Sequence, residues 1–545
     1  VGDRHGEDGR VNRIASHQPR RARGHAIFSG KKATGVDVGG SGDGERQQGV
    51  KRVTETKLNQ SFDRVLIANR GEIAVRVIRA VREMGMESVA VYSEADRTAP
   101  HVTLADRSVC IGPAPVTDSY LNVAAVIEAA KDSGAQAIHP GYGLLSENAD
   151  FAEAVTEAGL VWIGPPPAAM RLMASKTDAR AAMIEAGVPV VPGGDVDESD
   201  RVGFPLLVKA AAGGGGKGMR RVDNAADLAD AVAACQREAG KSFGDDTIFL
   251  ERFLEHPRHV EVQVMADQQG TVIHLGEREC SVQRRHQKVV EESPSVAVSD
   301  ALRDEMGATA VAAAQSVGYV GAGTVEFLLD EDGSYYFLEM NTRLQVEHPA
   351  TELVTGLDLV HEQLRVAQGQ PLSITQESMS QHGHAIECRI YAEDPETYLP
   401  QTGDIAVLSI PDGPGIRHDA GIEEGWTVGV DYDPLLAKLC AWGRTRTEAI
   451  QRMTRALSEY SVLGVQTNLS LLRHVVAHPE FAKGNTKTSF LTDFPYKAEP
   501  VPPIVYAARA LMALHGLPAT TAVASEGPDA GDSQSPWARL KGWRL

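Results

Sequence analysis

Cysteine is scarce in this chain: the 545 residues include five, at positions 110, 235, 280, 388 and 440, with no CxxC pair. Thiols this scattered exclude a zinc ribbon or a disulfide framework and fit a reducing cytosol. Apolar residues never form a run of about 18, so no membrane span is predicted. The N-terminus also lacks the apolar core of a signal peptide. We therefore expect a cytoplasmic protein with no membrane partner.

Positive charge is also in short supply, with 54 Lys and Arg against 73 Asp and Glu and a net charge of −19. This balance argues against general binding to nucleic acid or anionic membranes, although one local basic pocket could still hold an anion. The hydrophobic content of 42% and the charged content of 23% are ordinary for a globular protein. The length predicts about three or four domains.

Residues 1–60 lack apolar periodicity and hold 12 Lys or Arg against 7 Asp or Glu, unlike the acidic remainder. Such a segment buries too little apolar surface to offset its ordering entropy. We interpret it as a disordered tail or a mis-assigned start. A mitochondrial-type presequence is the weaker alternative, because acidic residues are present.

Ordered structure is expected from Phe62 onward. Residues 61–175 alternate strands with helices, which predicts a parallel α/β domain. Residues 176–378 begin with a strand, a glycine loop and further alternating strands, and residues 379–493 predict an α+β domain. The predicted class is therefore α/β and α+β multidomain. Residues 494–545 are interpreted as a linker and the start of a following domain.

A hairpin is predicted within "GTVEFLLDEDGSYYFLEMN", residues 323–341. Asp332-Gly333 is typical of a two-residue type I′ turn, and with that centre Glu326 faces Glu339. Like charges directly opposite destabilise a sheet, whereas a magnesium ion bound by both, with Asn341, would reverse the effect. A solvated face with two tolerated glutamates is an equally weighted alternative. The predicted apolar face carries Val325, Phe327, Leu329, Tyr336, Leu338 and Met340.

The glycine loop "GGGGKG", residues 213–218, lets backbone N–H groups approach phosphates, with a lysine adding charge. It is not a P-loop, because Lys217 is followed by Gly218 and a strand, not by Ser/Thr and a helix. A mobile flap over a nucleotide is the preferred interpretation. A floppy connector is the alternative.

Two further segments concentrate polar groups. "ECSVQRRHQKVVEE" (279–292) places cationic residues among acidic ones, which indicates an anion site or, more commonly, a surface charge run. "NTRLQVEHP" (341–349) follows the hairpin directly and offers Glu347 as a base and Arg343 as an anion holder. A polar loop ending at Pro349 is the alternative for the second segment.

Residues from about Phe62 to Asp493 resemble biotin carboxylases of the ATP-grasp superfamily. The matching runs are "ANRGEIAVRVIRA", "HPGYGLLSEN", "SKTDAR", "KAAAGGGGKGM", "HPRHVEVQV", "ERECSVQRRHQKVVEE", "GAGTVEFL", "EMNTRLQVEHP" and "AIECRIYAEDP". The resemblance is strongest to the biotin-bearing alpha subunits of acetyl-/propionyl-CoA (acyl-CoA) carboxylases. It implies a biotin carboxylase N-terminal domain, an ATP-grasp domain with a glycine-rich lid at about 190–265, and a biotin carboxylase C-terminal domain.

The resemblance also implies a role for individual residues. Those expected to hold ATP phosphates are Lys176, Lys209, Gly213, Gly214, Gly215, Gly216, Lys217 and Gly218. Those expected in or near the adenine pocket are Glu251, Arg252, Leu254, His259, Gln283 and His286. Those expected to bind Mg²⁺ (or Mn²⁺) are Glu326, Glu339 and Asn341. Those expected to hold bicarbonate are Lys288, Arg343, Gln345 and Val346. Glu347 would deprotonate bicarbonate, Arg389 would stabilise the biotin enolate, and Tyr142 would lie near the biotin ring.

The implied reaction joins ATP, bicarbonate and a biotinylated carrier to give ADP, phosphate and N-carboxybiotin through carboxyphosphate. The implied partners are a biotin carboxyl carrier domain or protein, a carboxyltransferase beta subunit and a second copy of the chain in a homo-oligomer. The competing hypotheses are another ATP-grasp ligase, such as a carbamoyl-phosphate synthase half, and a truncated nucleotide-binding subunit without productive turnover.

The chain departs from this family pattern in two places. Biotin-bearing alpha subunits carry a Met-Lys-Met biotinylation site, which this sequence lacks. "SPWARLKGWRL" (535–545) resembles the opening strand of the linker domain that precedes the carrier, after a loose linker at 516–534. A fragment, a frameshifted product and a subunit with a separate carrier all remain open. Pro414 stands where bacterial carboxylases often have an aromatic residue near the dimer contact, so the dimer mode is also open.

Overall fold

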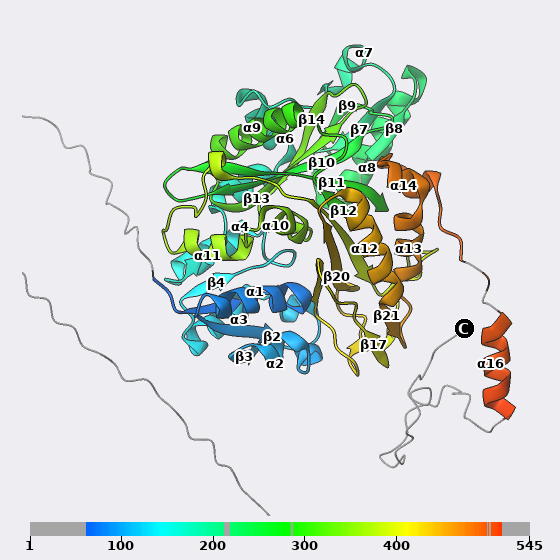
Figure 1. The fold of residues 1–545 in the computed structure, drawn as a ribbon. Helices are drawn as coiled ribbons and strands as arrows, with labels where there is room; N and C mark the ends of the chain where they lie inside the picture. The colour runs from blue at the N-terminus through cyan, green and yellow to red at the C-terminus, as the bar shows by residue number, and fades with distance from the viewer. Residues whose placement is uncertain (1–60, 212–218, 285–286, 499, 501–502, 515–545) are drawn as a thin grey trace, which may run out of the picture. The chain divides into compact units, whose positions relative to one another are not determined.

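The computed structural model describes residues 61–211, 219–284, 287–498, 500 and 503–514. The first region is a five-stranded parallel sheet in the order β3-β2-β1-β4-β5. Its strands are β1 (Arg64–Ile67), β2 (Glu87–Tyr92), β3 (Arg107–Cys110), β4 (Ala137–His139) and β5 (Val161–Trp162). Its helices are α1 (Gly71–Glu83), α2 (Pro100–Leu104), α3 (Val123–Ser133), α4 (Ala149–Glu157) and α5 (Pro167–Ala174). The predicted parallel α/β architecture is confirmed (Figure 1).

Helix α1 is amphipathic and brings a charged residue into the interior. Ile73, Val77 and Ile78 lie in the hydrophobic core under the parallel sheet. Glu72, in the first turn, is nevertheless buried. A Cβ atom added at Gly421 would lie 2.5 Å from the Glu72 backbone nitrogen, so only glycine lets the chain there approach the start of α1 this closely.

A four-stranded sheet follows in the order β6-β9-β7-β8. Its strands are β6 (Gly193–Gly194), β7 (Leu206–Ala210), β8 (Met219–Val222) and β9 (Ile248–Arg252). Helix α6 (Lys176–Glu185) precedes it in the chain and packs, through Ala179 and Met183, in the core of the larger sheet that follows, whereas α7 (Ser199–Val202) and α8 (Leu228–Phe243) pack against the four-stranded sheet. This sheet has its own small core around Leu206, Val208 and Leu250. The residue range expected for the lid, 190–265, includes all four strands of this sheet. It ends within the strand that follows the sheet in sequence, β10 (Arg258–Ala266).

The largest sheet has eight antiparallel strands in the order β14-β13-β10-β11-β12-β15-β20-β18. These are β10 (Arg258–Ala266), β11 (Val272–Arg284), β12 (Gln287–Ser293), β13 (Gly321–Leu329), β14 (Tyr335–Asn341), β15 (His384–Tyr391), β18 (Ile416–Ala420) and β20 (Leu435–Gly443). Because β12 pairs with β15, hydrogen bonds run without a break across the expected domain boundary at 378/379.

The remaining elements surround this sheet or follow it. The helices are α9 (Asp300–Ser316), α10 (His348–Thr355), α11 (Leu359–Ala367), α12 (Arg446–Glu459), α13 (Leu469–Ala477), α14 (Pro479–Lys483), α15 (Phe490–Asp493) and α16 (Pro503–Leu514). The short strand pairs are β16 (Gly403–Asp404) with β19 (Thr427–Val428), and β17 (Val407–Ser409) with β21 (Ser461–Leu463). Helices α12 and α13 share a core with β15 and β20. Among the described helices, none has both the length and the apolar character needed to cross a bilayer.

The β13–β14 hairpin forms, but its turn differs from the prediction. The backbone N–H of Asp330 donates to Ser334 O at 2.8 Å, and that of Gly333 donates to Asp330 O at 3.1 Å. These bonds close a three-residue loop, with Gly333 in the left-handed region at φ +88°. The predicted two-residue turn centred on Asp332-Gly333 is therefore wrong, because glycine serves here as the last residue of a longer loop.

A bulge restores the register that the turn had shifted. Phe327 pairs with Phe337, but the next pair is Glu326 with Glu339, so β14 carries one extra residue, Leu338. The two glutamates face each other as predicted, although for a different reason. The predicted apolar face is wrong for the part of β14 between the loop and the bulge. There Tyr335 and Phe337 enter the core in place of Tyr336 and Leu338.

His139, at the end of β4, should make stability sensitive to acid. The Gly141 N–H donates to its Nδ1 at 3.0 Å, so the proton lies on Nε2, 3.2 Å from Gln363 Oε1. Burial, assisted by the Arg76 charge, lowers the pKa of His139 to about 4. The unfolded chain therefore binds more protons than the folded one between its ordinary pKa, about 6.5, and this value. The free energy of unfolding falls as pH falls through that window.

We expect a His139→Gln variant to lose less stability than the parent on acidification. At pH 5 the difference should be on the order of 2 kcal/mol. Thermal midpoints at pH 7 and pH 5 measure it, with exposed His382→Gln as the matched control. An equal loss of midpoint in parent and His139→Gln would contradict the assignment.

Candidate active site

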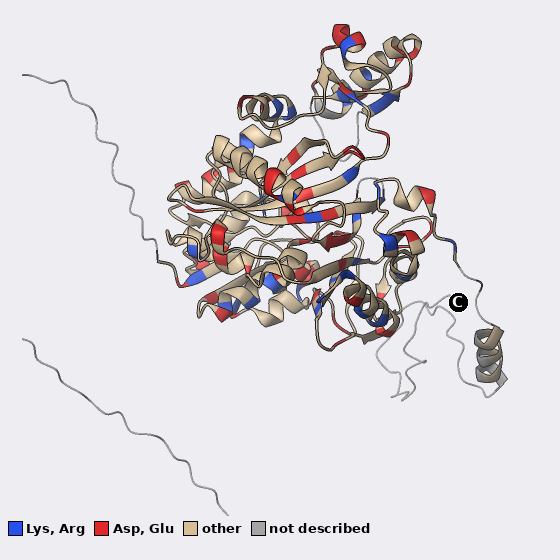
Figure 2. Ribbon diagram, turned by 45° about the horizontal axis from the view of Figure 1, so that its top comes forward, with Lys and Arg blue, Asp and Glu red and all other residues tan. Residues whose placement is uncertain are grey.

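One face of the eight-stranded sheet carries charged side chains on adjacent strands. Figure 2 shows acidic and basic residues on the strands as well as on the helices. Cross-strand register pairs them directly: Glu326 with Glu339, Glu261 with Glu326, Glu261 with Arg278, Glu291 with Glu387, and Arg389 with Lys438. Side chains at paired positions project on the same face. The sheet thus gathers these groups in one place.

The Lys288 ammonium, on β12, lies at the centre of this face. Its Nζ donates to Glu261 Oε2 at 2.5 Å, to Glu326 Oε1 at 2.7 Å and to Glu347 Oε1 at 2.7 Å. All three donors of the ammonium are therefore used. Burial alone would lower the pKa of Lys288, but the three carboxylates raise it well above its usual value. The lysine is a fixed positive charge.

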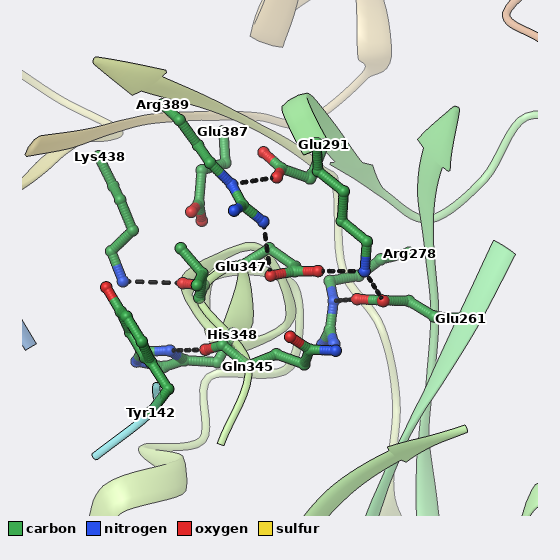
Figure 3. Close-up of polar contacts among 12 residues, drawn as sticks. Tyr142, Glu261, Arg278, Glu291, Gln345, Glu347, His348, Glu387, Arg389 and Lys438 are labelled. Atoms are coloured by element: carbon green, nitrogen blue, oxygen red, sulfur yellow. Dashed lines mark hydrogen bonds and ion pairs between the residues drawn. The ribbon is translucent and has the colours of Figure 1, made fainter. Parts of the chain in front are cut away.

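Glu347, at the N-cap of α10, is fully buried between two cations. Its second oxygen accepts from Arg389 Nη2 at 2.8 Å, and Arg389 Nε donates to Glu291 Oε1 at 2.5 Å (Figure 3). Burial by itself would raise the pKa of Glu347, yet Lys288 and Arg389 hold it well below its usual range. Burial raises the pKa of Glu291 to about 7, although Arg389 opposes the shift.

Arg278 of β11 binds Glu261 on the oxygen that does not contact Lys288. Its side chain is 0% exposed. Its guanidinium donates to Glu261 Oε1 at 2.6 Å, to Gln263 Oε1 at 2.8 Å and to the hydroxyls of Thr351 at 2.8 Å and Thr324 at 3.2 Å. Glu261 is therefore held by one cation on each oxygen, so its orientation toward Lys288 is fixed.

The polar loop after β14 is held by its own side chains. Arg343 donates to Glu147 Oε2 at 2.9 Å, to Gln345 Oε1 at 2.9 Å and to Asn341 Oδ1 at 3.0 Å. Asn341 Nδ2 and Gln345 Nε2 donate to Glu326 Oε1 at 2.8 and 3.1 Å. The loop predicted from "NTRLQVEHP" is thus joined to the hairpin glutamate and the Lys288 cluster.

The two hairpin glutamates differ in environment. Glu326 is buried, and its Oε2 lies 2.8 Å from His259 Nε2. Burial alone would raise its pKa, but Lys288 and His259 lower it. Glu339 is exposed, and partial desolvation with the Glu326 charge raises its pKa. The carboxylates of Glu326 and Glu339 are the kind of ligand that Mg²⁺ binds in proteins, whereas Asn341 turns its Nδ2 toward Glu326 and its Oδ1 toward Arg343.

A second group of predicted residues lies on the four-stranded sheet and α6. Lys209 Nζ donates to Glu251 Oε2 at 2.6 Å, and the same β9 strand carries Arg252, with buried Leu254 just beyond it. Lys176 begins α6, where burial and the Lys209 charge lower its pKa. A bound anion would relieve the repulsion between these two lysines, so this position suits an anion.

The other predicted residues are placed as follows. Gln283 pairs in register with Lys288. The Tyr142 hydroxyl donates to Glu72, and the Val346 carbonyl accepts from Lys438. The glycine loop, Gly213–Gly218, and His286 lie outside the described residues, as do the segments 1–60 and 516–545.

Sequence reasoning missed several charged residues of this network: Glu261, Arg278, Glu291, Glu72 and Lys438. Two of them carried a readable signal. In "RHVEVQVMA" the polar residues His259, Glu261 and Gln263 alternate with valines, which predicts one polar face that includes Glu261. In "LLAKLCAWG" a single lysine interrupts an apolar strand. Such a lysine is buried only if it has partners.

Three family models match the chain. Residues 61–170 match the N-terminal domain of biotin carboxylase, 175–375 the ATP-binding domain of the carbamoyl-phosphate synthase L chain, and 387–493 the C-terminal domain of biotin carboxylase. The middle match is to an ATP-grasp domain, which agrees with the predicted class.

Relatives match over most of their length. Biotin carboxylase 2 of Bacillus subtilis is 51% identical over 439 residues, covering 79% of this chain and 99% of the relative. The alpha subunit of mitochondrial methylcrotonoyl-CoA carboxylase of Dictyostelium discoideum is 47% identical over 493 residues, covering 88% of this chain and 70% of the relative.

Solved structures agree with these matches. A Campylobacter jejuni biotin carboxylase with beta-gamma-ATP has a TM-score of 0.77 at 44% identity, covering 79% of this chain and 99% of that one. The biotin carboxylase domain dimer of Hydrogenobacter thermophilus 2-oxoglutarate carboxylase, with MgADP, ADP and bicarbonate, gives 0.77 at 44% identity, covering 81% of this chain and 100% of that one. The chain belongs to the biotin carboxylase family.

Proposed function

We propose that the chain catalyses ATP- and bicarbonate-dependent carboxylation of biotin on a carrier, through carboxyphosphate. The observation that carries the proposal is the ionised Glu347 held between Lys288 and Arg389 at 2.7 and 2.8 Å. A carboxylate placed between two fixed cations can accept a proton from a bound anion, and the cations can hold that anion in place. The family membership and the bicarbonate in a related structure support this reaction.

Glu347 is the proposed base. A pKa well below the usual range keeps it ionised at neutral pH, as a base must be, but also makes it a weak one. Negative charge on a bicarbonate bound beside Lys288 and Arg389 would offset their positive charge and so raise the proton affinity of Glu347. Substrate binding would thus strengthen the base at the moment it is needed.

Bicarbonate is proposed to bind beside the polar loop. Lys288 supplies a compact charge, and Arg343 supplies a planar fork suited to a carboxylate-like anion. Gln345 and Val346 lie between Arg343 and Glu347 in sequence and complete the proposed contact set. Arg343 already holds Gln345 and Asn341, so its guanidinium is oriented before the substrate arrives.

ATP is proposed to lie across Lys176, Lys209 and the hairpin, with its adenine near Glu251, Arg252 and Leu254. Glu326, Glu339 and Asn341 would hold Mg²⁺, which when bound neutralises charge on the transferring phosphate. His259 and Lys288 both contact Glu326, which keeps that carboxylate ionised and oriented. Phosphoryl transfer depends mainly on such positioning and neutralisation.

Arg389 is proposed to stabilise the biotin enolate, and Tyr142 to lie near the biotin ring. The guanidinium is held between Glu347 and Glu291, so one fixed cation serves the bicarbonate side and the biotin side. A preorganised charge of this kind needs little rearrangement when negative charge develops.

We propose an acyl-CoA carboxylase as the setting of this half-reaction. The similarity to an alpha subunit of methylcrotonoyl-CoA carboxylase supports it. A biotin carrier domain or protein, a carboxyltransferase beta subunit and a second copy of the chain are the proposed partners, the last supported by a related dimer. A cytoplasmic location is part of the proposal, supported by the five unpaired thiols.

The central test is bicarbonate-dependent ATP hydrolysis, with and without free biotin. Glu347→Gln should lower the biotin-stimulated rate of ADP release about 10²–10⁴-fold, because it removes the base while keeping the side-chain shape. Exposed Glu331→Gln, on the hairpin loop, is the matched control and should match the parent. Nucleotide binding by the parent without biotin-dependent turnover would leave a nucleotide-binding subunit as the surviving hypothesis.

Glu339→Gln tests the metal assignment. The concentration of Mg²⁺ at half-maximal ATP hydrolysis should rise at least about 10-fold, because one charged oxygen donor is lost. Direct Mn²⁺ titration followed by electron paramagnetic resonance should show the same weakening. Without metal or nucleotide, the variant should melt no lower than the parent, because repulsion by Glu326 is relieved. Unchanged Mg²⁺ and Mn²⁺ affinities would reject Glu339 as a ligand.

A further inference from the structure

Lys438, in the middle of β20, is a fully buried lysine, 0% exposed. Its Nζ donates to the backbone carbonyl of Val346 at 2.8 Å and lies 3.3 Å from Glu72 Oε1. The ammonium also lies 5.7 Å from the centre of the Tyr142 ring, within the range of a cation–π contact. A buried ammonium is costly unless it is paired, so these contacts explain how it is tolerated.

The partners of Lys438 come from segments far apart in sequence. Glu72 lies in the first turn of α1, and Tyr142 follows β4 in the parallel domain. The Tyr142 hydroxyl donates to Glu72 Oε1, the oxygen nearest Lys438. Val346 lies in the polar loop, next to Glu347. One ammonium therefore joins the N-terminal parallel domain, the polar loop and the strand β20 (Figure 3).

The bond to Val346 constrains the proposed base. A peptide unit is planar, so fixing the Val346 carbonyl fixes the plane that ends at the Cα atom of Glu347. The Glu347 side chain then reaches Lys288 and Arg389 from a set backbone orientation. A small misplacement of a reacting group can cost about 10²-fold in rate. The Lys438 bond is therefore well placed to set the efficiency of proton removal.

We propose that Lys438 is a positioning residue for the bicarbonate step: it holds the Val346 carbonyl and so orients Glu347, while Glu72 and Tyr142 hold the lysine. This inference rests on the proposed function, because it assigns a role within the same site. It also joins the two sides of that site. Tyr142 belongs to the proposed biotin side, yet its hydroxyl reaches the base loop through Glu72 and Lys438.

The charge environment agrees with this geometry. Burial raises the pKa of Glu72 to about 7, with the Lys438 charge opposing the shift. Burial would lower the pKa of Lys438, but Glu72 and Glu387 raise it. Loss of the lysine would therefore leave Glu72 without its cation and the Val346 carbonyl without this donor.

The experiment compares Lys438→Met with Arg446→Met in the full chain. Arg446 is a suitable control because it is also largely buried, pairing with Glu292 Oε2 at 2.6 Å and donating to the carbonyls of Phe481 at 2.6 Å and Ala482 at 2.8 Å. It makes the same kinds of bond as Lys438 but none to the polar loop. Thermal unfolding reports on folding of both variants.

The kinetic readout is bicarbonate-dependent ATP hydrolysis without biotin, at varied bicarbonate and at varied ATP. Lys438→Met should lower kcat/KM for bicarbonate about 10²-fold and leave the KM for ATP within about twofold. Arg446→Met, even if it melts earlier, should leave both constants near the parent values. Equal kinetic losses in the two variants would overturn the positioning role.

Two further substitutions test the contacts that hold Lys438 in place, which come from Tyr142 and Glu72. Tyr142→Phe keeps the ring and removes the hydroxyl, and it should lower kcat/KM for bicarbonate severalfold even with no biotin present. Glu72→Gln should do the same, and its effect should vanish in the Lys438→Met background because the two act through one bond. Full activity of Tyr142→Phe and Glu72→Gln would remove both residues from the proposal.

The outcomes separate this inference from the proposed function. A parent chain that hydrolyses no ATP in response to bicarbonate refutes the proposed function and this inference with it. An active parent whose Lys438→Met variant is folded and kinetically normal refutes the inference alone. If Lys438→Met does not fold, Lys438→Gln decides: its side chain is shorter and ends short of the position of the ammonium, so an unchanged kcat/KM for bicarbonate would overturn the proposal.

Discussion

The site depends on one ammonium shared by three carboxylates. Lys288 lies within 2.7 Å of oxygens from Glu261, Glu326 and Glu347, which come from β10, β13 and the start of α10. Without that charge, three buried glutamates would face one another, and such groups usually protonate instead of remaining ionised. The lysine therefore keeps ionised both the proposed base and the proposed metal ligand.

Around this ammonium, arginines on other strands of the sheet hold the carboxylates in place. Arg278 holds Glu261 from the far side, and Arg389 holds Glu347 against Glu291. Glu261, Glu326 and Glu347 are each held by cationic side chains from strands of this sheet, so their orientation follows from the order and register of the strands. Preorganisation of this kind places the cost of orienting charges in folding and not in the reaction.

The sequence predicted which residue types form the site better than it predicted which side chains contact one another. The facing glutamates of the hairpin were predicted from a two-residue turn that does not form. The loop has three residues, which shifts the strand register by one, and the bulge at Leu338 shifts it back, so the two glutamates still face each other. The approach of Lys288 to Glu347 depends on pairing across several strands, which local patterns do not encode. Lys438 was visible as a polar interruption of an apolar strand, but its partner Glu72 lies more than 360 positions away.

The unbroken ladder from β12 to β15 has a consequence for how the chain can be divided. A cut at residue 378 would remove β15, β20 and β18, and would expose β12 as a new sheet edge with unpaired backbone groups. Exposed edges recruit other strands, so a fragment ending there should self-associate. It would also carry Glu291 without its counter-ion Arg389. The two regions on either side of residue 378 are therefore one unit of stability.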